Sequence, residues 1–329
     1  MSLPRVSVAL CTCNGEPFIG EQVRSILRQT MPVSEVVVRD DASTDSTLAE
    51  IKRVWREVAQ GNAVPVLRLH RNPVRLGVAS NFESALSDCT GDLIALCDQD
   101  DVWHPARMAR LVQRFEHRKD LLMVHGNARL VDASGRTLGR TLFDALSVSE
   151  RELGAISAGR GWQPLLDRNL VTGATSMLRR SLLTLALPIP PSWLHDEWLG
   201  IVAALLGGLE VERVPLLDYR QHGGNLIGAR REGLSDWVRR AIEPRGSWME
   251  QRVLRANALE ARAVRWGSLL GPAQHEAIRE KAAHHRARAA LPPQRLARVA
   301  PIWREWRTGR YARYGRGALG LLRDLLQPA

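Results

Sequence analysis

Two observations predict an α/β fold followed by a helical C-terminal extension for this chain of 329 residues. In the first half of the sequence, short apolar segments alternate with segments of helical spacing. That pattern is typical of a largely parallel sheet with helices on both faces. After Gly228 the sequence has helical spacing, interrupted at prolines. With 45% hydrophobic and 25% charged residues, the composition is that of a globular protein, which excludes disordered and fibrous classes.

The strands and helices can be assigned in order along the first half. The segment 5–13 (RVSVALCTC) is almost wholly apolar, as a strand buried on both faces requires. The later strands are expected at residues 35–39, 65–70 and 92–97, and the helices at residues 20–28, 46–57, 81–88 and 105–115. The region 121–217 is of mixed character. Ligands of such sheets bind at the carboxyl ends of the strands, so the residues that follow each strand are candidates for a site.

The net charge of +11 is concentrated at the C-terminal end. Residues 229–329 contain 21 Lys and Arg against 9 Asp and Glu, whereas the first 228 residues contain 25 basic and 26 acidic groups. Five of the ten tryptophans also lie in this basic extension. Such a segment indicates an anionic partner, either a membrane surface or a nucleic acid. The alternative is that its helices pack on the rest of the protein, with the tryptophans inward and the arginines solvated.

No membrane-spanning segment is expected. The longest uncharged apolar run, residues 198–209, has twelve residues, and a spanning helix needs about 20. The N-terminus shows no secretory signal. We therefore expect a cytoplasmic protein.

Three acidic clusters are the candidates for chemistry. Residues 40–45 (DDASTD) follow the second strand, residues 98–101 (DQDD) follow the fourth, and residues 195–197 (HDE) begin a helix. Helix capping is the alternative interpretation of the first cluster. An N-terminal cap, with acids near the positive end of the helix dipole, is the alternative for the third.

The second cluster is harder to explain by structure alone, because three carboxylates in four positions repel one another. A divalent cation would offset the repulsion, and Mg²⁺ completes its shell with substrate phosphates. The sequence contains neither a G-x-x-x-x-G-K-[ST] loop nor a G-x-G-x-x-G after the first strand. A nucleotide diphosphate held through a D-x-D metal site therefore fits best.

Several motifs occur in a specific order and spacing over roughly residues 4–228. They are VSVALCTCNG at 6–15, SILRQT at 25–30, DDASTD at 40–45, NPVRLG at 72–77, CDQDDVW at 97–103, GAT at 173–175, HD at 195–196 and YRQHGGN at 219–225. Together they resemble glycosyltransferase family 2, and within it a rhamnosyltransferase-like branch.

The resemblance implies a GT-A fold for residues 1–228, with a nucleotide-sugar half of about residues 1–120 and an acceptor half of about 121–228. Residues 229–329 lie outside the motifs. In this reading Asp41 accepts a hydrogen bond from a pyrimidine N3–H, and Asp98 lies on the ribose side. The implied nucleotide-sugar-binding residues are Thr12, Cys13, Asn14, Asp41, Arg71, Asp98 and Gln99.

The resemblance also implies the metal ligands and the general base. Asp100 and His222 would bind Mg²⁺ or Mn²⁺, although a solvated turn histidine is the alternative for His222. Asp196 would accept the proton of the acceptor hydroxyl, as an inverting transfer requires a carboxylate opposite the leaving group. Supporting or acceptor-side positions are Asp101, Trp103, Gly173, His195 and Glu197. Gly173 could equally be a plain turn glycine.

We therefore expect an inverting, metal-dependent glycosyltransferase of bacterial surface-polysaccharide synthesis. It would move rhamnose or another hexose from a UDP- or dTDP-sugar to a glycan or lipid-linked glycan acceptor. Contact of the basic extension with the cytoplasmic face of the inner membrane is expected as well, whereas oligomeric state stays open. Two alternatives remain, namely a nucleotidyltransferase that uses the D-x-D metal and a nucleic-acid-binding protein that acts through the basic extension.

Overall fold

The computed structural model describes residues 4–59, 64–223 and 246–328. The chain forms two compact units, the first made of Met1–Gly161 and Leu170–Arg230 and the second of Trp162–Asn169 and Arg231–Ala329. The segment Trp162–Asn169 thus folds with the C-terminal helices, although the sequence analysis placed it inside the acceptor half.

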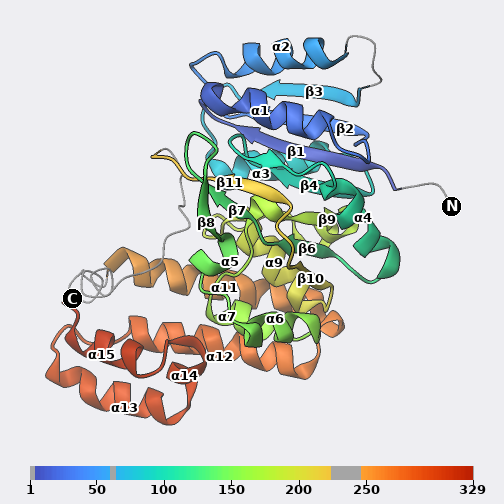
Figure 1. Ribbon diagram of the computed structural model, residues 1–329. Helices are drawn as coiled ribbons and strands as arrows, with labels where there is room; N and C mark the ends of the chain where they lie inside the picture. Colours follow the sequence, from blue (N-terminus) through green and yellow to red (C-terminus); the bar gives the residue numbers. More distant parts are fainter. Residues whose placement is uncertain (1–3, 60–63, 224–245, 329) are drawn as a thin grey trace. The chain divides into compact units, whose positions relative to one another are not determined.

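A seven-stranded sheet forms the centre of the first unit (Figure 1). Its strands are β1 (Val6–Thr12), β2 (Glu35–Asp40), β3 (Val66–Arg71), β4 (Leu93–Cys97), β6 (Met123–Gly126), β9 (Met177–Arg179) and β10 (Leu209–Glu212). The order is β10-β6-β9-β4-β1-β2-β3. All neighbours are parallel except β9, which runs antiparallel to β4 and β6. The predicted α/β class is confirmed. The antiparallel strand β9 was not predicted, because it has only three residues.

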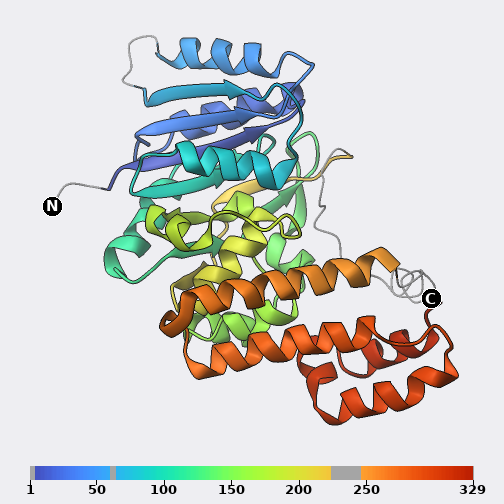
Figure 2. The same cartoon turned by 180° about the vertical axis from the view of Figure 1, so that it is seen from behind.

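Helices cover both faces of this sheet. They are α1 (Glu16–Leu27), α2 (Thr47–Ala59), α3 (Val78–Asp88), α4 (Arg107–His117), α5 (Leu142–Ala145), α6 (Glu150–Ser157), α8 (Leu183–Ala186) and α9 (His195–Leu205). Apolar side chains of α1, α2 and α4 form one core with alternate residues of the strands, such as Val6, Val8 and Leu10 of β1. The helix α3 lies on the opposite face, as the view from behind shows (Figure 2). Burial on both faces explains why β1 is apolar throughout.

A smaller sheet stands beside the carboxyl end of β4. It comprises β5 (Val102–Trp103), β7 (Arg129–Val131), β8 (Thr137–Thr141) and β11 (Leu217–Arg220), in the order β5-β11-β7-β8. Because β5 begins just after the acidic segment 98–101, its pairing with β11 brings a distant part of the chain to that segment.

The second unit is helical. In its described residues the helices are α7 (Trp162–Asp167), α11 (Gly246–Trp266), α12 (Pro272–Ala289), α13 (Val299–Arg307), α14 (Arg310–Tyr314) and α15 (Ala318–Leu326). The interior contains a polar network in which Arg288 donates two hydrogen bonds to Asp324, at 2.6 and 2.9 Å, and Tyr311 donates a third at 2.7 Å. Trp266 is buried, whereas Trp303 and Trp306 are exposed. The alternative of inward tryptophans and solvated arginines therefore does not describe Trp303, Trp306 and Arg288. Within the described part of the chain, none of the helices has the length and apolar character that crossing a membrane requires.

Candidate active site

The ends of three parallel strands lie level with one another at one edge of the central sheet. Thr12 at the end of β1 is in register with Asp40 at the end of β2, and Asp40 is in register with Arg71 at the end of β3. On the other side of β1, β4 ends at Cys97, which is in register with Leu10. The residues after these strands therefore meet at the edge where ligands bind in open α/β sheets.

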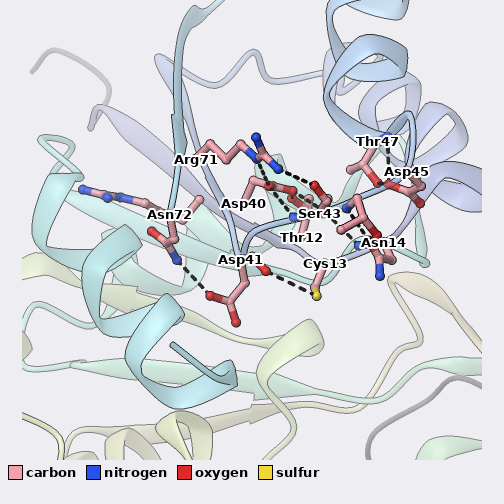
Figure 3. A network of polar contacts seen from close by, with 12 residues as sticks. Thr12, Cys13, Asn14, Asp40, Asp41, Ser43, Asp45, Thr47, Arg71 and Asn72 are labelled. Atoms are coloured by element: carbon pink, nitrogen blue, oxygen red, sulfur yellow. Dashed lines mark hydrogen bonds and ion pairs between the residues drawn. The ribbon is translucent and has the colours of Figure 1, made fainter. Parts of the chain in front are cut away.

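Asp40 is the buried anchor of this edge (Figure 3). Its carboxylate accepts hydrogen bonds from the Thr12 hydroxyl at 2.9 Å, the Ser43 hydroxyl at 2.5 Å and the Ser43 backbone N–H at 2.9 Å. Arg71 lies 3.8 Å from the same carboxylate and donates to the Ser43 carbonyl oxygen at 2.8 Å. Two of the predicted nucleotide-sugar-binding residues, Thr12 and Arg71, are thus fixed by the turn that follows β2.

The same turn, residues 41–45, is bound to the segment after β1. Asn14 has a left-handed backbone (φ 51°), accepts a hydrogen bond from the Thr44 N–H at 2.8 Å and donates its own N–H to the Ser43 hydroxyl at 2.9 Å. The Asp45 carboxylate accepts hydrogen bonds from backbone N–H groups at the start of α1 and of α2. The capping interpretation of the first acidic cluster therefore describes Asp45, whereas Asp40 ties strand ends together.

Asp41 organises the loop after β3. Its Oδ1 accepts hydrogen bonds from the Leu76 N–H at 2.7 Å and the Asn72 amide at 3.0 Å, and its Oδ2 accepts one from the Gly77 N–H at 2.9 Å. A carboxylate has about four acceptor positions, so the chain itself already engages most of them. Contact between Asp41 and a pyrimidine N3–H stays a prediction and would use the capacity that remains on Oδ2.

Gln99 joins the carboxyl ends of β1 and β4. Its side-chain oxygen accepts the Cys13 N–H at 2.7 Å, and its amide nitrogen donates to the Cys13 carbonyl oxygen at 3.2 Å. A Cβ on Gly15 would overlap this amide, which explains the glycine there. Gln99 and Cys13, both predicted as nucleotide-sugar-binding residues, are thus neighbours that fix each other.

The acidic segment 98–101 places three carboxylates close together. Burial, and then repulsion from Asp100 and Asp196, raise the pKa of Asp98 to about 7. Burial, and then repulsion from Asp100 and Asp98, raise the pKa of Asp101 well above its ordinary value. Asp101 is buried and its Oδ1 accepts the Arg220 N–H at 3.2 Å. Asp196, which is distant in sequence, therefore contributes to the same patch of negative charge.

His222 reaches this segment through the small sheet. β11 pairs with β5, with Leu217 opposite Trp103. Two residues beyond the end of β11, His222 Nε2 lies 2.8 Å from Asp100 Oδ2, and the ring stacks on Phe18 with centroids 4.6 Å apart. Trp103, predicted on the acceptor side, is buried in the core beside α1 and α4.

Asp196 lies at the N-terminus of α9. Its Oδ2 accepts the Gly173 N–H at 3.0 Å and its Oδ1 accepts the Glu197 N–H at 2.8 Å, so two backbone donors orient the carboxylate. Gly173 itself is buried, and a Cβ there would lie 2.7 Å from His195 Nε2. The glycine is thus required for close packing against the helix start.

The ring of His195 packs against α3. It is buried and stacks on Phe82 of α3, with ring centroids 3.8 Å apart and an interplanar angle of 13°. Burial lowers its pKa, partly opposed by Asp196. His195 therefore supports the position of Asp196 through packing rather than through a polar contact to the acidic segment.

Three residues near the carboxylates were not among the predicted site residues. Arg107 is buried over the Trp103 ring, with its guanidinium carbon 4.3 Å from the ring centroid, and its charge opposes the raised pKa values of Asp98 and Asp101. Arg220 donates to the Asp100 carbonyl oxygen at 2.9 Å. Burial and repulsion from Asp98, Asp101, Asp100 and Asp196 raise the pKa of Tyr219. The signal that could have identified them is their place inside the motifs: Arg107 follows CDQDDVW by a few residues, and Tyr219 and Arg220 begin YRQHGGN.

The donor set at Asp100 suits a divalent cation that also binds phosphate. Among the residues that the structure describes, no group of three or more His, Cys, Asp or Glu side chains is arranged to hold a metal ion. Asp100 Oδ2 and His222 Nε2 are nonetheless 2.8 Å apart and provide one carboxylate and one imidazole. Mg²⁺ sites built on one or two carboxylates take their remaining ligands from water and substrate phosphates. The residues present therefore fit a cation that arrives with a diphosphate.

These features define an α/β domain whose candidate ligand site lies at the carboxyl ends of the strands. The sequence model described as Glycosyl transferase family 2 matches residues 7–183. This match covers more than half of the chain, and the chain belongs to glycosyl transferase family 2.

Two relatives and a solved structure are similar to this chain. An uncharacterized glycosyltransferase of Nostoc sp. (strain PCC 7120) is 27% identical over 67% of this chain and 66% of the relative. An uncharacterized protein of Mycobacterium tuberculosis (strain H37Rv) is 27% identical over 66% of this chain and 59% of the relative. The chain thus spans somewhat less than two thirds of the length of these relatives. The structure of S. aureus TarS 1-349 in complex with UDP-GlcNAc is similar with a TM-score of 0.52 and 16% identity, over 97% of this chain and 89% of the TarS 1-349 chain. This likeness confirms the expected GT-A fold with C-terminal helices.

Proposed function

We propose that the chain is an inverting, metal-dependent glycosyltransferase that uses a nucleotide-diphosphate sugar. The observation that carries the proposal is the convergence of Asp196 with Asp98 and Asp100. Asp196 comes from the start of α9 and the other two from the loop after β4, yet their charges interact. A metal-dependent inverting transfer uses a cation at the leaving diphosphate and a separate carboxylate at the acceptor hydroxyl, and the proposal assigns Asp100 to the first role and Asp196 to the second.

Asp196 is the proposed general base. In the transfer, the acceptor oxygen forms a bond to the anomeric carbon, the bond from that carbon to the diphosphate oxygen breaks, and the acceptor proton moves to Asp196. The backbone donors at Gly173 and Glu197 hold the carboxylate in one orientation. The free-energy cost of reorienting it when the acceptor binds is therefore small. Glu197, the next residue of the helix, points in a different direction, since successive helical residues are about 100° apart.

Asp100 and His222 are the proposed ligands of Mg²⁺ or Mn²⁺, with Asp101 and Arg220 supporting the loop. A divalent cation would neutralise the charge that develops on the diphosphate. The nucleoside would lie along Thr12, Cys13, Asn14, Asp41, Arg71, Asp98 and Gln99, the residues that the strand ends and the Asp40 network hold together. We propose a UDP or dTDP sugar as donor, with rhamnose or another hexose as the sugar.

The remaining assignments extend this proposal. Residues 1–228 would form the catalytic domain, with its nucleotide-sugar half at about 1–120 and its acceptor half at about 121–228, and residues 229–329 the extension. The acceptor would be a glycan or lipid-linked glycan of a bacterial surface polysaccharide. The enzyme would then work in the cytoplasm, at the inner face of the membrane that carries such an acceptor.

Calorimetry with UDP, dTDP, GDP and CDP, with and without Mn²⁺, tests the donor site. We expect UDP or dTDP to bind in the presence of Mn²⁺. We expect the Asp100→Ala variant to lose the increase in nucleotide affinity that Mn²⁺ gives. Glu116→Ala, an exposed acid on α4, is the matched control and is expected to bind as the wild type does. Absence of binding by all four nucleotides at millimolar concentration would contradict the proposal and favour a polyanion partner for the basic extension.

A further inference from the structure

A line of large apolar side chains lies exposed along α13 and the short turn before it. Leu296, Val299, Trp303 and Trp306 are 90%, 52%, 56% and 47% exposed. Their spacing of three, four and three residues places them on one face of a helix. The rings of Trp303 and Trp306 stack on each other with centroids 4.9 Å apart. We call these four residues the apolar stripe.

The opposite face of the helix and of the turn before it is bound inside the second unit. Arg298 is buried and donates to the carbonyl oxygens of Pro292, Pro293, Asp324 and Gln327, at 2.6 to 3.0 Å. Further along, the side chains of Ile302 and Glu305 are buried, and Glu305 lies 2.7 Å from His284 Nδ1. The orientation of α13 is therefore fixed by its inner face, and the apolar stripe is exposed as a consequence.

The charges beside the apolar stripe have a single sign. Arg295, Arg304 and Arg307 are exposed. The one acidic residue between positions 295 and 310 is Glu305, which is turned inward toward His284 and receives a hydrogen bond from Arg310 at 2.6 Å. The outer face of α13 thus combines tryptophan, aliphatic side chains and arginine with no exposed carboxylate of its own.

We propose that this face binds an anionic lipid surface, with the apolar stripe inserted at the level of the headgroups and the arginines against lipid phosphates. Tryptophan is favoured at membrane–water interfaces, and a helix with an apolar face and a basic polar face lies in the interface plane. A symmetric dimer through this face would bring the arginines of two copies together, which disfavours a second copy as the occupant. The inference rests on the proposed function, because binding of this face to lipid would hold the enzyme at the membrane where a lipid-linked acceptor resides.

Co-sedimentation of the full chain with vesicles tests the proposal. We expect binding to vesicles of phosphatidylcholine mixed with phosphatidylglycerol, weak binding to phosphatidylcholine alone, and a decrease with added salt. Arg304→Gln and Arg307→Gln should each lower the partition coefficient roughly fivefold. The double variant Trp303→Ser with Trp306→Ser should lower it by about tenfold or more. Val264→Ser, which alters a residue 76% exposed on α11, is the control and should leave binding unchanged.

The outcomes separate this inference from the proposed function. Circular dichroism establishes that the double variant is folded, and calorimetry of nucleotide binding should give the wild-type affinity. Equal binding to neutral and anionic vesicles would overturn the inference. So would an equal loss of vesicle binding in Val264→Ser and in the double variant. A dimer seen by light scattering that the double variant loses, without lipid binding by the wild type, would assign the stripe to a second copy and overturn it as well. Vesicle binding without any nucleotide binding would leave the inference standing and refute the proposed function.

Discussion

His222 and Asp100 are 122 positions apart in the sequence, yet His222 Nε2 lies 2.8 Å from Asp100 Oδ2. The contact exists because β11 pairs with β5, the strand that follows the acidic segment, and because the imidazole stacks on Phe18. A basic imidazole is thus held against a carboxylate at the edge where a diphosphate is expected. We propose the pair as two ligands of a divalent cation, and its contribution can be measured directly.

Replacing His222 by asparagine is expected to weaken nucleotide binding only when metal is present. The shorter amide removes the imidazole from the proposed cation, and we expect the affinity for UDP in Mn²⁺ to fall by about tenfold or more. With EDTA the affinity should equal that of the wild type. Calorimetry in both conditions measures the difference. His117→Asn, which changes an exposed histidine of α4, provides the control, and equal affinities of His222→Asn and wild type in Mn²⁺ would remove His222 from the metal site.

Asp196→Asn is expected to abolish transfer while donor binding persists. The single asparagine oxygen can accept one of the two backbone hydrogen bonds that the carboxylate accepts, from Gly173 or from Glu197, so one bond to the helix start is retained. It cannot take up the acceptor proton, and loss of such a base costs on the order of a hundred- to ten-thousand-fold in rate. The turnover rate and the donor affinity should be measured on the same preparations. Glu197→Gln should reduce the rate far less, and the reverse result would transfer the role of base to Glu197.

Apart from the two-residue strand β5, the order of elements up to α4 could be predicted from the sequence. There β1, β2 and β4 have apolar runs and β3 alternates apolar with polar residues, so the local pattern agrees with the tertiary environment. β9 escaped prediction, because three residues carry too little periodicity and its antiparallel position depends on neighbours from both halves of the domain. The pairing of β5 with β11 could not be predicted either, because β5 has only two residues.

The residues of the candidate site could be predicted from the motifs, but their contacts with one another could not. The motifs indicate that Asp41 and His195 matter, yet they do not show that Asp41 holds the backbone of Leu76 and Gly77 or that His195 stacks on Phe82. Both arrangements depend on side-chain packing between elements distant in sequence. Arg107 was overlooked as a site residue for a related reason: an arginine is expected at the surface, and its burial beside Asp98 and Asp101 becomes visible only in the structure.

Gly173→Ala is expected to destabilise the protein and to impair transfer. The added Cβ would lie 2.7 Å from His195 Nε2, and the stacked, buried imidazole has little room to move. Overpacking of this kind costs about 1–3 kcal/mol of unfolding free energy, which denaturant titration can measure. Gly154→Ala is the matched control, because a Cβ there meets no atom within 4 Å and the residue lies in α6. That variant should gain about 0.5–1 kcal/mol, and equal effects at the two positions would contradict the packing argument.

Glu212→Gln is expected to lower stability in a pH-dependent way. The Glu212 carboxylate is buried and accepts hydrogen bonds at 2.9 Å from Arg110, from Arg114 and from the Val214 N–H. Burial alone would raise its pKa, but these bonds outweigh burial and hold the pKa of Glu212 below its ordinary value. A carboxylate with a lowered folded-state pKa stabilises the fold above its unfolded-state pKa, and that contribution disappears as the pH falls through the folded-state pKa.

At neutral pH the Gln variant should therefore be less stable than wild type by about 1–3 kcal/mol, since charged hydrogen bonds to a buried group are lost while both arginines remain partly solvated. The difference should stay constant down to a pH near the unfolded-state value of about 4.3 and shrink below it. Denaturant unfolding at several pH values measures this curve. Glu116→Gln, an exposed acid on the same helix as Arg110 and Arg114, should show no such difference. A gap between Glu212→Gln and wild type that persists undiminished at low pH would mean that the carboxylate charge is not what stabilises this end of the sheet.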